Sequence, residues 1–252
     1  MNDVLTQLQL RGQVVSAVVV ILVLIGSSHL WCRKRGHPAS LLKDFLLYGG
    51  GVAILAGRFA WVATTSPRVF LNPFDLIRVQ SGIDLATASL AFALFSLYRA
   101  RRQGSEILEF GAIAVLLAPA LYAGLCLFRG DCYGRAAHPP WGMRFGEWTE
   151  PRLPIGLYES ILLLALIPIV ISLPVRRWLL PWLTLGAFGL AEFAIEFGRV
   201  GELTRFTGGW RWGWLLFAAV ATAIAMLQGR RPWRHESLVD GPNEHAPPLG
   251  GT

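Results

Sequence analysis

Long apolar runs, separated by short polar connections, make up most of the chain. Each run has about the length that a helix needs to cross a bilayer, which is about 20 residues. We therefore predict an all-α integral membrane protein with about seven transmembrane helices. The predicted helices cover residues 13–31, 41–65, 80–98, 107–128, 155–174, 178–198 and 211–228.

Basic residues cluster in the connections that follow the first, third, fifth and seventh runs. They occur at 33–35, 99–102, 176–177 and 230–234. Short connections rich in Arg and Lys lie on the cytoplasmic side of a membrane. This pattern predicts the N-terminus outside and the C-terminus in the cytoplasm. It also accounts for the net charge of +7 without a nucleic-acid partner.

The composition fits a single membrane domain. The chain is 54% hydrophobic and 15% charged, whereas a soluble domain has about 25% charged residues. We predict a membrane domain at 1–228 with a polar outer loop at 129–154, and a disordered, Pro- and Gly-rich cytoplasmic tail at 229–252. Cys126 and Cys132 flank the outer boundary and form either a disulfide or two free thiols. The three cysteines indicate no metal site.

The sixth run contains three ionisable residues, although each such residue costs at least about 2.5 kcal/mol at the centre of a bilayer. Glu192, Glu196 and Arg199 are spaced i, i+4 and i+7, so they share one face of a helix. Two interpretations stay open. The residues form either an internally paired stripe that holds helices together or one wall of a polar cavity.

Other polar residues lie near the outer ends of the runs. Arg58 follows Gly57 in the second run, and its guanidinium suits either a phosphate or the internal carboxylate of Asp84. Tyr158 and Glu159 open the fifth run. We expect these groups to meet in a polar cavity that opens towards the outer leaflet, where arginines bind a phospholipid phosphate. The residues expected to converge are Arg58, Arg129, Asp131, Arg135, Glu159, Glu192, Glu196 and Arg199.

Four motifs, in order, resemble the prolipoprotein diacylglyceryl transferase family. "AGRFAWV" at 56–62 resembles its glycine-glycine-arginine helix, and "GDCYGRAAHPPWGMRF" at 130–145 resembles its Gly-Glu-Leu-Tyr/Trp-Gly-Arg stretch and the proline-tryptophan-glycine turn that follows. "LPIGLYES" at 153–160 resembles its His-Pro-Ser-Gln-Leu-Tyr-Glu motif, and "EFAIEFGR" at 192–199 its Arg-Phe-x-x-Glu-Phe-x-Arg helix. The resemblance extends from about residue 8 to 230.

The resemblance implies a reaction and a location. Members of the family, in the bacterial inner membrane, transfer the diacylglyceryl group of phosphatidylglycerol to the lipobox cysteine of a prolipoprotein. A thioether forms and glycerol phosphate leaves. The reaction needs cationic donors at the departing phosphate and a proton acceptor for the thiol, without metal or other cofactor. The implied partners are a phosphatidylglycerol-like lipid and a prolipoprotein signal peptide, and the protein is expected to be a monomer.

Several family residues are retained, and the resemblance implies their roles. Asp131, Glu196 and Arg199 would be catalytic. The substrate-binding set would comprise Arg58, Gly134, Arg135, Tyr158 and Glu159, together with Glu192 and with Arg129 as a substitute for a missing arginine.

Other family positions are changed. Ala86 stands for a histidine, Ala123 for an arginine, Cys126 for an asparagine, and Glu192 reverses the charge of an arginine. The chain is therefore expected to be an active transferase or a diverged lipid-handling relative, and the alternative is a non-catalytic paralogue that binds phospholipid or lipoprotein. A transporter is disfavoured, because the runs show neither broken helices nor inverted repeats.

Overall fold

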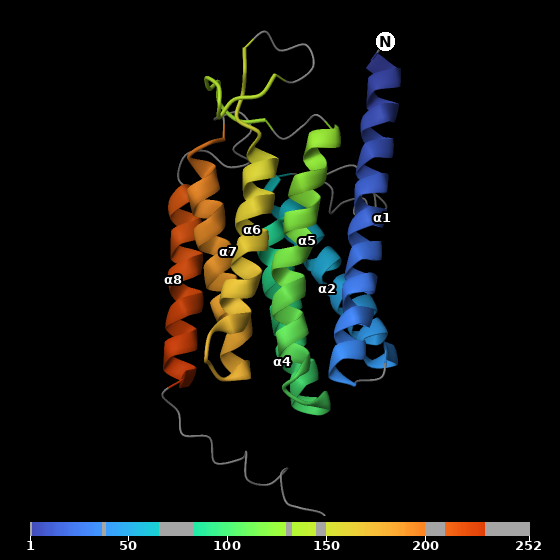
Figure 1. Cartoon of the computed structure of the whole chain (residues 1–252), viewed down its shortest axis with the longest axis vertical. Coiled ribbons are helices and arrows are strands. Elements are labelled where there is room, and N and C mark those ends of the chain that lie inside the picture. The colour runs from blue at the N-terminus through green and yellow to red at the C-terminus, as the bar shows by residue number, and fades with distance from the viewer. Residues whose placement is uncertain are drawn as a thin grey trace, which may run out of the picture.

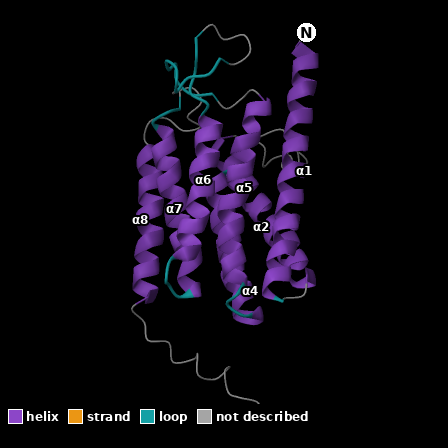
Figure 2. Ribbon diagram, in the orientation of Figure 1, coloured by secondary structure: helices purple, strands orange, loops and turns teal. Residues whose placement is uncertain are grey.

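The computed structural model describes residues 2–36, 39–65, 83–129, 133–144, 150–199 and 210–229. Within these ranges the regular structure is helical, apart from two isolated β-bridges (Figure 2). The all-α prediction is confirmed for this part of the chain. The elements are α1 (Asn2–Arg35), α2 (Ala39–Thr65), α4 (Leu85–Gln103), α5 (Ile107–Arg129), α6 (Ile155–Ser172), the 3₁₀ turn η2 (Arg177–Leu179), α7 (Leu180–Glu196) and α8 (Trp210–Gly229).

Every predicted apolar run coincides with one of these helices, although some boundaries differ. The run predicted at 80–98 is helical only from Leu85, because Asp84 caps α4 by accepting a hydrogen bond of 2.7 Å from the backbone N–H of Thr87. The same helix continues through its basic last turn and ends at Gly104, whose φ of 102° suits glycine. The tail predicted at 229–252 lies outside the described residues, apart from Gly229.

Four described segments are long and apolar enough to cross a membrane by length and composition. They are Leu42–Thr64, Ile107–Cys126, Ile155–Ser172 and Arg177–Glu196. A shorter apolar segment, Trp212–Gln228, lies in α8. This finding agrees with a membrane protein, while seven spans and the orientation of the termini stay predictions.

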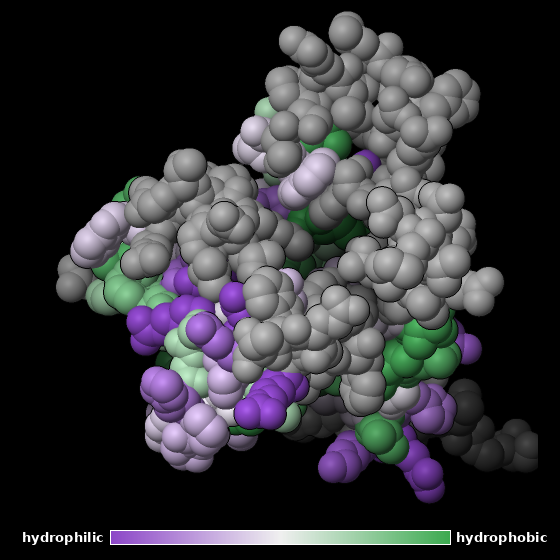
Figure 3. All heavy atoms as spheres, turned by 90° about the horizontal axis from the view of Figure 1, so that it is seen from above, coloured by the Kyte–Doolittle hydropathy of each residue, from purple (hydrophilic) through white to green (hydrophobic). Residues whose placement is uncertain are grey.

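The helices stand side by side in a bundle (Figure 1). The most extensive packing joins α5 to α6, α7 to α8, and α2 to α4. The connection between α5 and α6 rises above the end of the bundle at which α6 begins and α7 ends (Figure 1). Seen from this end, both hydrophilic and hydrophobic side chains reach the rim of the molecule (Figure 3). The polar connection therefore lies over the ends of α6 and α7.

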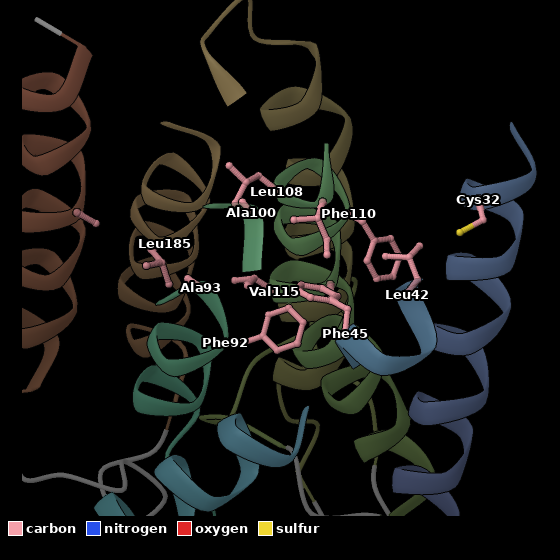
Figure 4. Close-up of a cluster of buried hydrophobic side chains, with 13 residues drawn as sticks. Cys32, Leu42, Phe45, Phe92, Ala93, Ala100, Leu108, Phe110, Val115 and Leu185 are labelled. Atoms are coloured by element: carbon pink, nitrogen blue, oxygen red, sulfur yellow. The ribbon is translucent and has the colours of Figure 1, made fainter. Parts of the chain in front are cut away.

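Aromatic side chains fill the core between α2, α4 and α5 (Figure 4). The ring of Phe45 lies 5.3 Å from that of Phe92 and 6.2 Å from that of Phe110, both edge to face, which is a favoured geometry for aromatic pairs. A second cluster, which includes Leu116, Leu163 and Phe188, joins α5, α6 and α7. These two clusters hold the helices that carry the polar residues in a defined arrangement.

Gly57 permits the closest approach between α2 and the start of α4. Its carbonyl accepts a hydrogen bond of 3.0 Å from the backbone N–H of Asp84. A Cβ at Gly57 would lie 2.7 Å from the carbonyl oxygen of Asp84 and 2.9 Å from the Cβ of Ala88. The Asp84 carboxylate is engaged in capping α4 through the backbone N–H of Thr87.

We predict that Gly57→Ala destabilises the protein by about 1–3 kcal/mol, because a backbone atom would have to move to make room for the methyl group. Gly50→Ala in the same helix is the matched control, since a Cβ there meets nothing within 4 Å. The measurement is thermal unfolding of both variants in detergent. Equal melting temperatures for the two variants would show that the α2–α4 contact is not tight.

Candidate functional site

One guanidinium gathers three carboxylates at the end of the bundle. Arg199 Nη1 donates to Glu196 Oε1 at 2.7 Å. Its Nη2 donates to Glu159 Oε2 at 2.8 Å and to Glu192 Oε2 at 3.2 Å. We call these four residues the Arg199 cluster. The cluster joins α7, which carries two of the carboxylates, to α6, which carries the third.

Local structure explains how the four side chains meet. Glu192 and Glu196 lie one turn apart on the same face of α7. The helix ends at Glu196, and the chain then turns, with Gly198 N–H donating to Ile195 O at 2.9 Å. This turn places Arg199 beside the last turn of α7 with its guanidinium facing both carboxylates.

The Arg199 cluster is buried and carries more negative than positive formal charge. The Glu192 side chain is 2% exposed, Glu159 8% and Glu196 9%, while Arg199 is 23% exposed. Burial acts to lower the pKa of Arg199, but the three carboxylates outweigh it and raise this pKa above its ordinary value, so that the guanidinium stays charged. Buried ion pairs of this kind hold their partners firmly, because removing one leaves the others uncompensated.

The backbone of the outer loop docks beside the Arg199 cluster. Arg135 N–H donates to Gly198 O at 3.0 Å, and Gly134 N–H donates to Leu153 O at 2.7 Å. A Cβ at Gly134 would lie 2.5 Å from Ile155 Cγ1, so only glycine allows this approach. The Arg135 side chain is exposed. Gly134 thus acts through its small size, and Arg135 is available to a ligand at the surface.

Tyr158 ties the loop to the start of α6. Its hydroxyl donates to the carbonyl oxygen of Trp141 at 2.7 Å. Arg152, which is not among the predicted site residues, also organises the loop. Its backbone exchanges two hydrogen bonds of 2.8 Å with Met143, and its guanidinium lies 5.4 Å from the centre of the Tyr133 ring. Such a role depends on the folded path of the loop and has no periodic signal in the sequence.

The structure brings together half of the eight charged residues that were expected to converge, namely Glu159, Glu192, Glu196 and Arg199. Arg58 is buried on α2, with its guanidinium 5.4 Å from the centre of the Trp61 ring of the same helix. Asp131 and the side chain of Arg129 lie outside the described residues. The functional roles of all these residues stay predictions.

Two open alternatives from the sequence can be compared with the structure. Glu192, Glu196 and Arg199 do form an internally paired stripe, which is extended by Glu159 from a second helix. Cys126 is disulfide-bonded, and it is buried near the end of α5. The bonded alternative therefore holds at Cys126, while Cys132 lies outside the described residues.

One groove among the described residues is apolar, and its lining includes no residue of the Arg199 cluster. It has a volume of about 580 Å³ and is formed between α7 and α8. Its lining includes Leu190, Leu215, Ala218, Thr222 and Met226. The groove is therefore separate from the polar cavity predicted from the sequence.

The fold and the site are those of a helical bundle, consistent with a membrane protein, in which the loop between α5 and α6 docks on a buried arginine–carboxylate cluster. The model of the prolipoprotein diacylglyceryl transferase family matches residues 6–229. The chain belongs to this family.

Curated relatives carry the name phosphatidylglycerol–prolipoprotein diacylglyceryl transferase. The protein of Nitrobacter winogradskyi is 28% identical over 246 residues, which cover 88% of this chain and 83% of the relative. That of Coxiella burnetii is 31% identical over 176 residues, or 66% of this chain and 67% of the relative. That of Geobacter sulfurreducens is 30% identical over 159 residues, or 58% of this chain and 60% of the relative. No solved structure matches.

We predict that Arg199→Ala destabilises the protein by about 3–5 kcal/mol, since it leaves three buried carboxylates without a counter-charge. Arg101→Ala is the control, because Arg101 is exposed at the other end of the bundle, in the last turn of α4. Thermal unfolding in detergent measures the effect. A melting temperature for Arg199→Ala equal to that of the control would mean that the cluster does not hold α6 and α7 together.

Tyr158→Phe should loosen the loop and leave the bundle intact. The substitution removes one hydrogen bond to Trp141 O, which is worth about 0.5–1.5 kcal/mol. Hydrogen exchange followed by mass spectrometry should show faster exchange at residues 141–144 and unchanged exchange in α6. Unchanged exchange in the loop would show that other contacts suffice to hold it.

Proposed function

We propose that this chain transfers the diacylglyceryl group of phosphatidylglycerol to the lipobox cysteine of a prolipoprotein. The family match over residues 6–229 carries this proposal. The names of the relatives give the same lipid and acceptor. The proposal includes a multi-pass, monomeric protein of the bacterial inner membrane, with seven spans at 1–228, the outer loop at 129–154 and a cytoplasmic tail at 229–252.

The reaction requires a thiolate, an electrophilic carbon and a leaving phosphate. The S–H bond of the acceptor cysteine breaks, sulfur bonds to the glyceryl carbon, and the bond from this carbon to the phosphate oxygen breaks. Glycerol phosphate leaves with the electron pair. Negative charge therefore builds up on the phosphate, and cationic donors there lower the barrier.

Arg199 is poorly suited to bind that phosphate directly. Both of its terminal nitrogens already donate to carboxylates at 2.7–3.2 Å. We assign it instead to holding Glu159 and the end of α7 in place beneath the loop. Phosphate binding then falls to Arg135, whose backbone is docked at Gly198 and whose side chain is exposed. Arg58 and Arg129 are the further candidates for this role.

A second candidate function rests on Glu192. This carboxylate is buried against Arg199 at a position where the family resemblance implies an arginine. A chain that kept the fold and lost the chemistry would bind phospholipid or lipoprotein without transferring the diacylglyceryl group. Ala86 and Ala123, which replace a histidine and an arginine of the family pattern, favour the same alternative.

Transfer is tested with purified protein reconstituted in phosphatidylglycerol vesicles together with a lipobox peptide. We expect release of glycerol phosphate and a peptide mass increased by one diacylglyceryl group. Arg135→Gln should lower the rate by about 10²-fold, the usual effect of losing a donor to a developing negative charge. Arg101→Gln is the matched control and should leave the rate unchanged.

The alternative predicts a different result in the same vesicles. A folded protein that binds phosphatidylglycerol yet releases no glycerol phosphate would reject the transferase and support the lipid-binding paralogue. Growth rescue of a bacterium depleted of its own transferase provides an independent measure. Rescue by this chain would exclude the paralogue.

A further inference from the structure

The Arg199 cluster contains one carboxylate oxygen that no donor satisfies. Glu192 Oε2 accepts from Arg199 Nη2 at 3.2 Å. Glu192 Oε1 is buried and has no hydrogen-bond partner among the described residues, in a side chain that is 2% exposed. A buried ionised oxygen without a donor costs several kcal/mol. A proton on the Glu192 carboxyl group would remove this free-energy cost.

The charge balance of the cluster also calls for a proton. Three carboxylates surround a single guanidinium. The charged groups that act on Glu192 are Glu159 from α6, and Glu196 and Arg199 from the end of α7. Two of these three neighbours are negative and one is positive. A negative charge on Glu192 is therefore disfavoured by its surroundings.

Glu159 and Glu192 meet at the same nitrogen. Both Oε2 atoms accept from Arg199 Nη2, so the two carboxylates lie at one guanidinium nitrogen. If both carboxylates were ionised, neither would carry a hydrogen to donate to the other. One proton held between them satisfies both groups and removes one negative charge from the cluster.

We propose that Glu159 and Glu192 share one proton and that this pair receives the proton lost by the acceptor thiol. The second half of the proposal rests on the transferase function proposed above. As the S–H bond breaks and the C–S bond forms, the thiol proton passes to the pair. As the C–O bond breaks, the pair returns a proton to the leaving phosphate, so that charge and protons balance.

Glu192 is a positioning residue in this scheme, since it is too buried to reach a substrate. It acts through Glu159, which lies near the outer end of α6, one residue after the tyrosine that holds the loop. Exchange of the proton between the two carboxylates lets the more accessible one accept or donate as needed. A pair with a single proton can do both, whereas a lone carboxylate can only accept.

Infrared spectroscopy tests the shared proton without any substrate. A protonated carboxyl gives a C=O band that shifts in D₂O, and the wild-type protein at pH 7 should show one. Glu192→Gln should abolish the band and keep the melting temperature, because an amide mimics a neutral carboxyl and can donate to Glu159. Glu106→Gln is the control, because the Glu106 carboxylate is exposed and pairs with Arg177 at 3.4 Å. This variant should change neither the infrared band nor the melting temperature.

The spectra alone can overturn the first half of the proposal. Absence of the band in the wild-type protein, or its persistence in both Glu192→Gln and Glu159→Gln, would show that the pair does not hold the proton. These outcomes do not depend on activity. Failure of the transferase function is therefore distinguishable from failure of the shared proton.

The second half is tested by the pH profile of the transfer rate. Glu192→Gln should lower kcat by about 10²-fold or more, as expected for a lost acid–base function, and should leave KM for phosphatidylglycerol unchanged. It should also remove or displace one limb of the wild-type pH profile. A variant with the wild-type kcat and the wild-type profile would overturn the proton transfer.

Discussion

Arg199 links the start of α6 to the end of α7 by donating hydrogen bonds to three carboxylates on these two helices. Glu159 lies near the start of α6, and Glu192 lies near the end of α7. The bonds of Arg199 to both residues therefore fix the position of these two helix ends relative to each other. The turn that carries Arg199 also carries Gly198, whose carbonyl receives the backbone of the outer loop. One side chain and its immediate neighbour thus link two helices and the loop above them.

Small residues allow this link to form. Gly134 and Gly198 both face Ile155, and at each position a Cβ would come within about 2.5 Å of that side chain. A larger residue would push the loop away from α7 and lengthen the bonds that the backbone makes there. The polar cluster and the close backbone contacts therefore depend on each other. The cluster sets the position of the turn, and the glycines let the loop reach it.

The sequence predicts much of this arrangement where a regular repeat is present. Apolar runs mark the helices, and the i, i+4, i+7 spacing correctly places Glu192, Glu196 and Arg199 together. The contribution of Glu159 depends on packing between residues 40 positions apart, which no local spacing specifies. Arg58 is also buried, yet its guanidinium lies against the ring of Trp61 on its own helix, α2. The free-energy cost of burying a charge indicates from the sequence which charged residues need a partner, but it does not indicate which residue that partner is.

The excess of negative charge has a consequence for how this family member handles an anionic lipid. A phosphate that approached the Arg199 cluster would meet three carboxylates bonded to one guanidinium, so these carboxylates would oppose the binding of a phosphate there. Headgroup binding and proton handling are then separated in space. In the proposed reaction, arginines outside the cluster would bind the headgroup, and the carboxylates within it would take up and return the proton. Such a division keeps the phosphate from competing for Arg199 and preserves the link between α6 and α7 while the lipid enters and leaves.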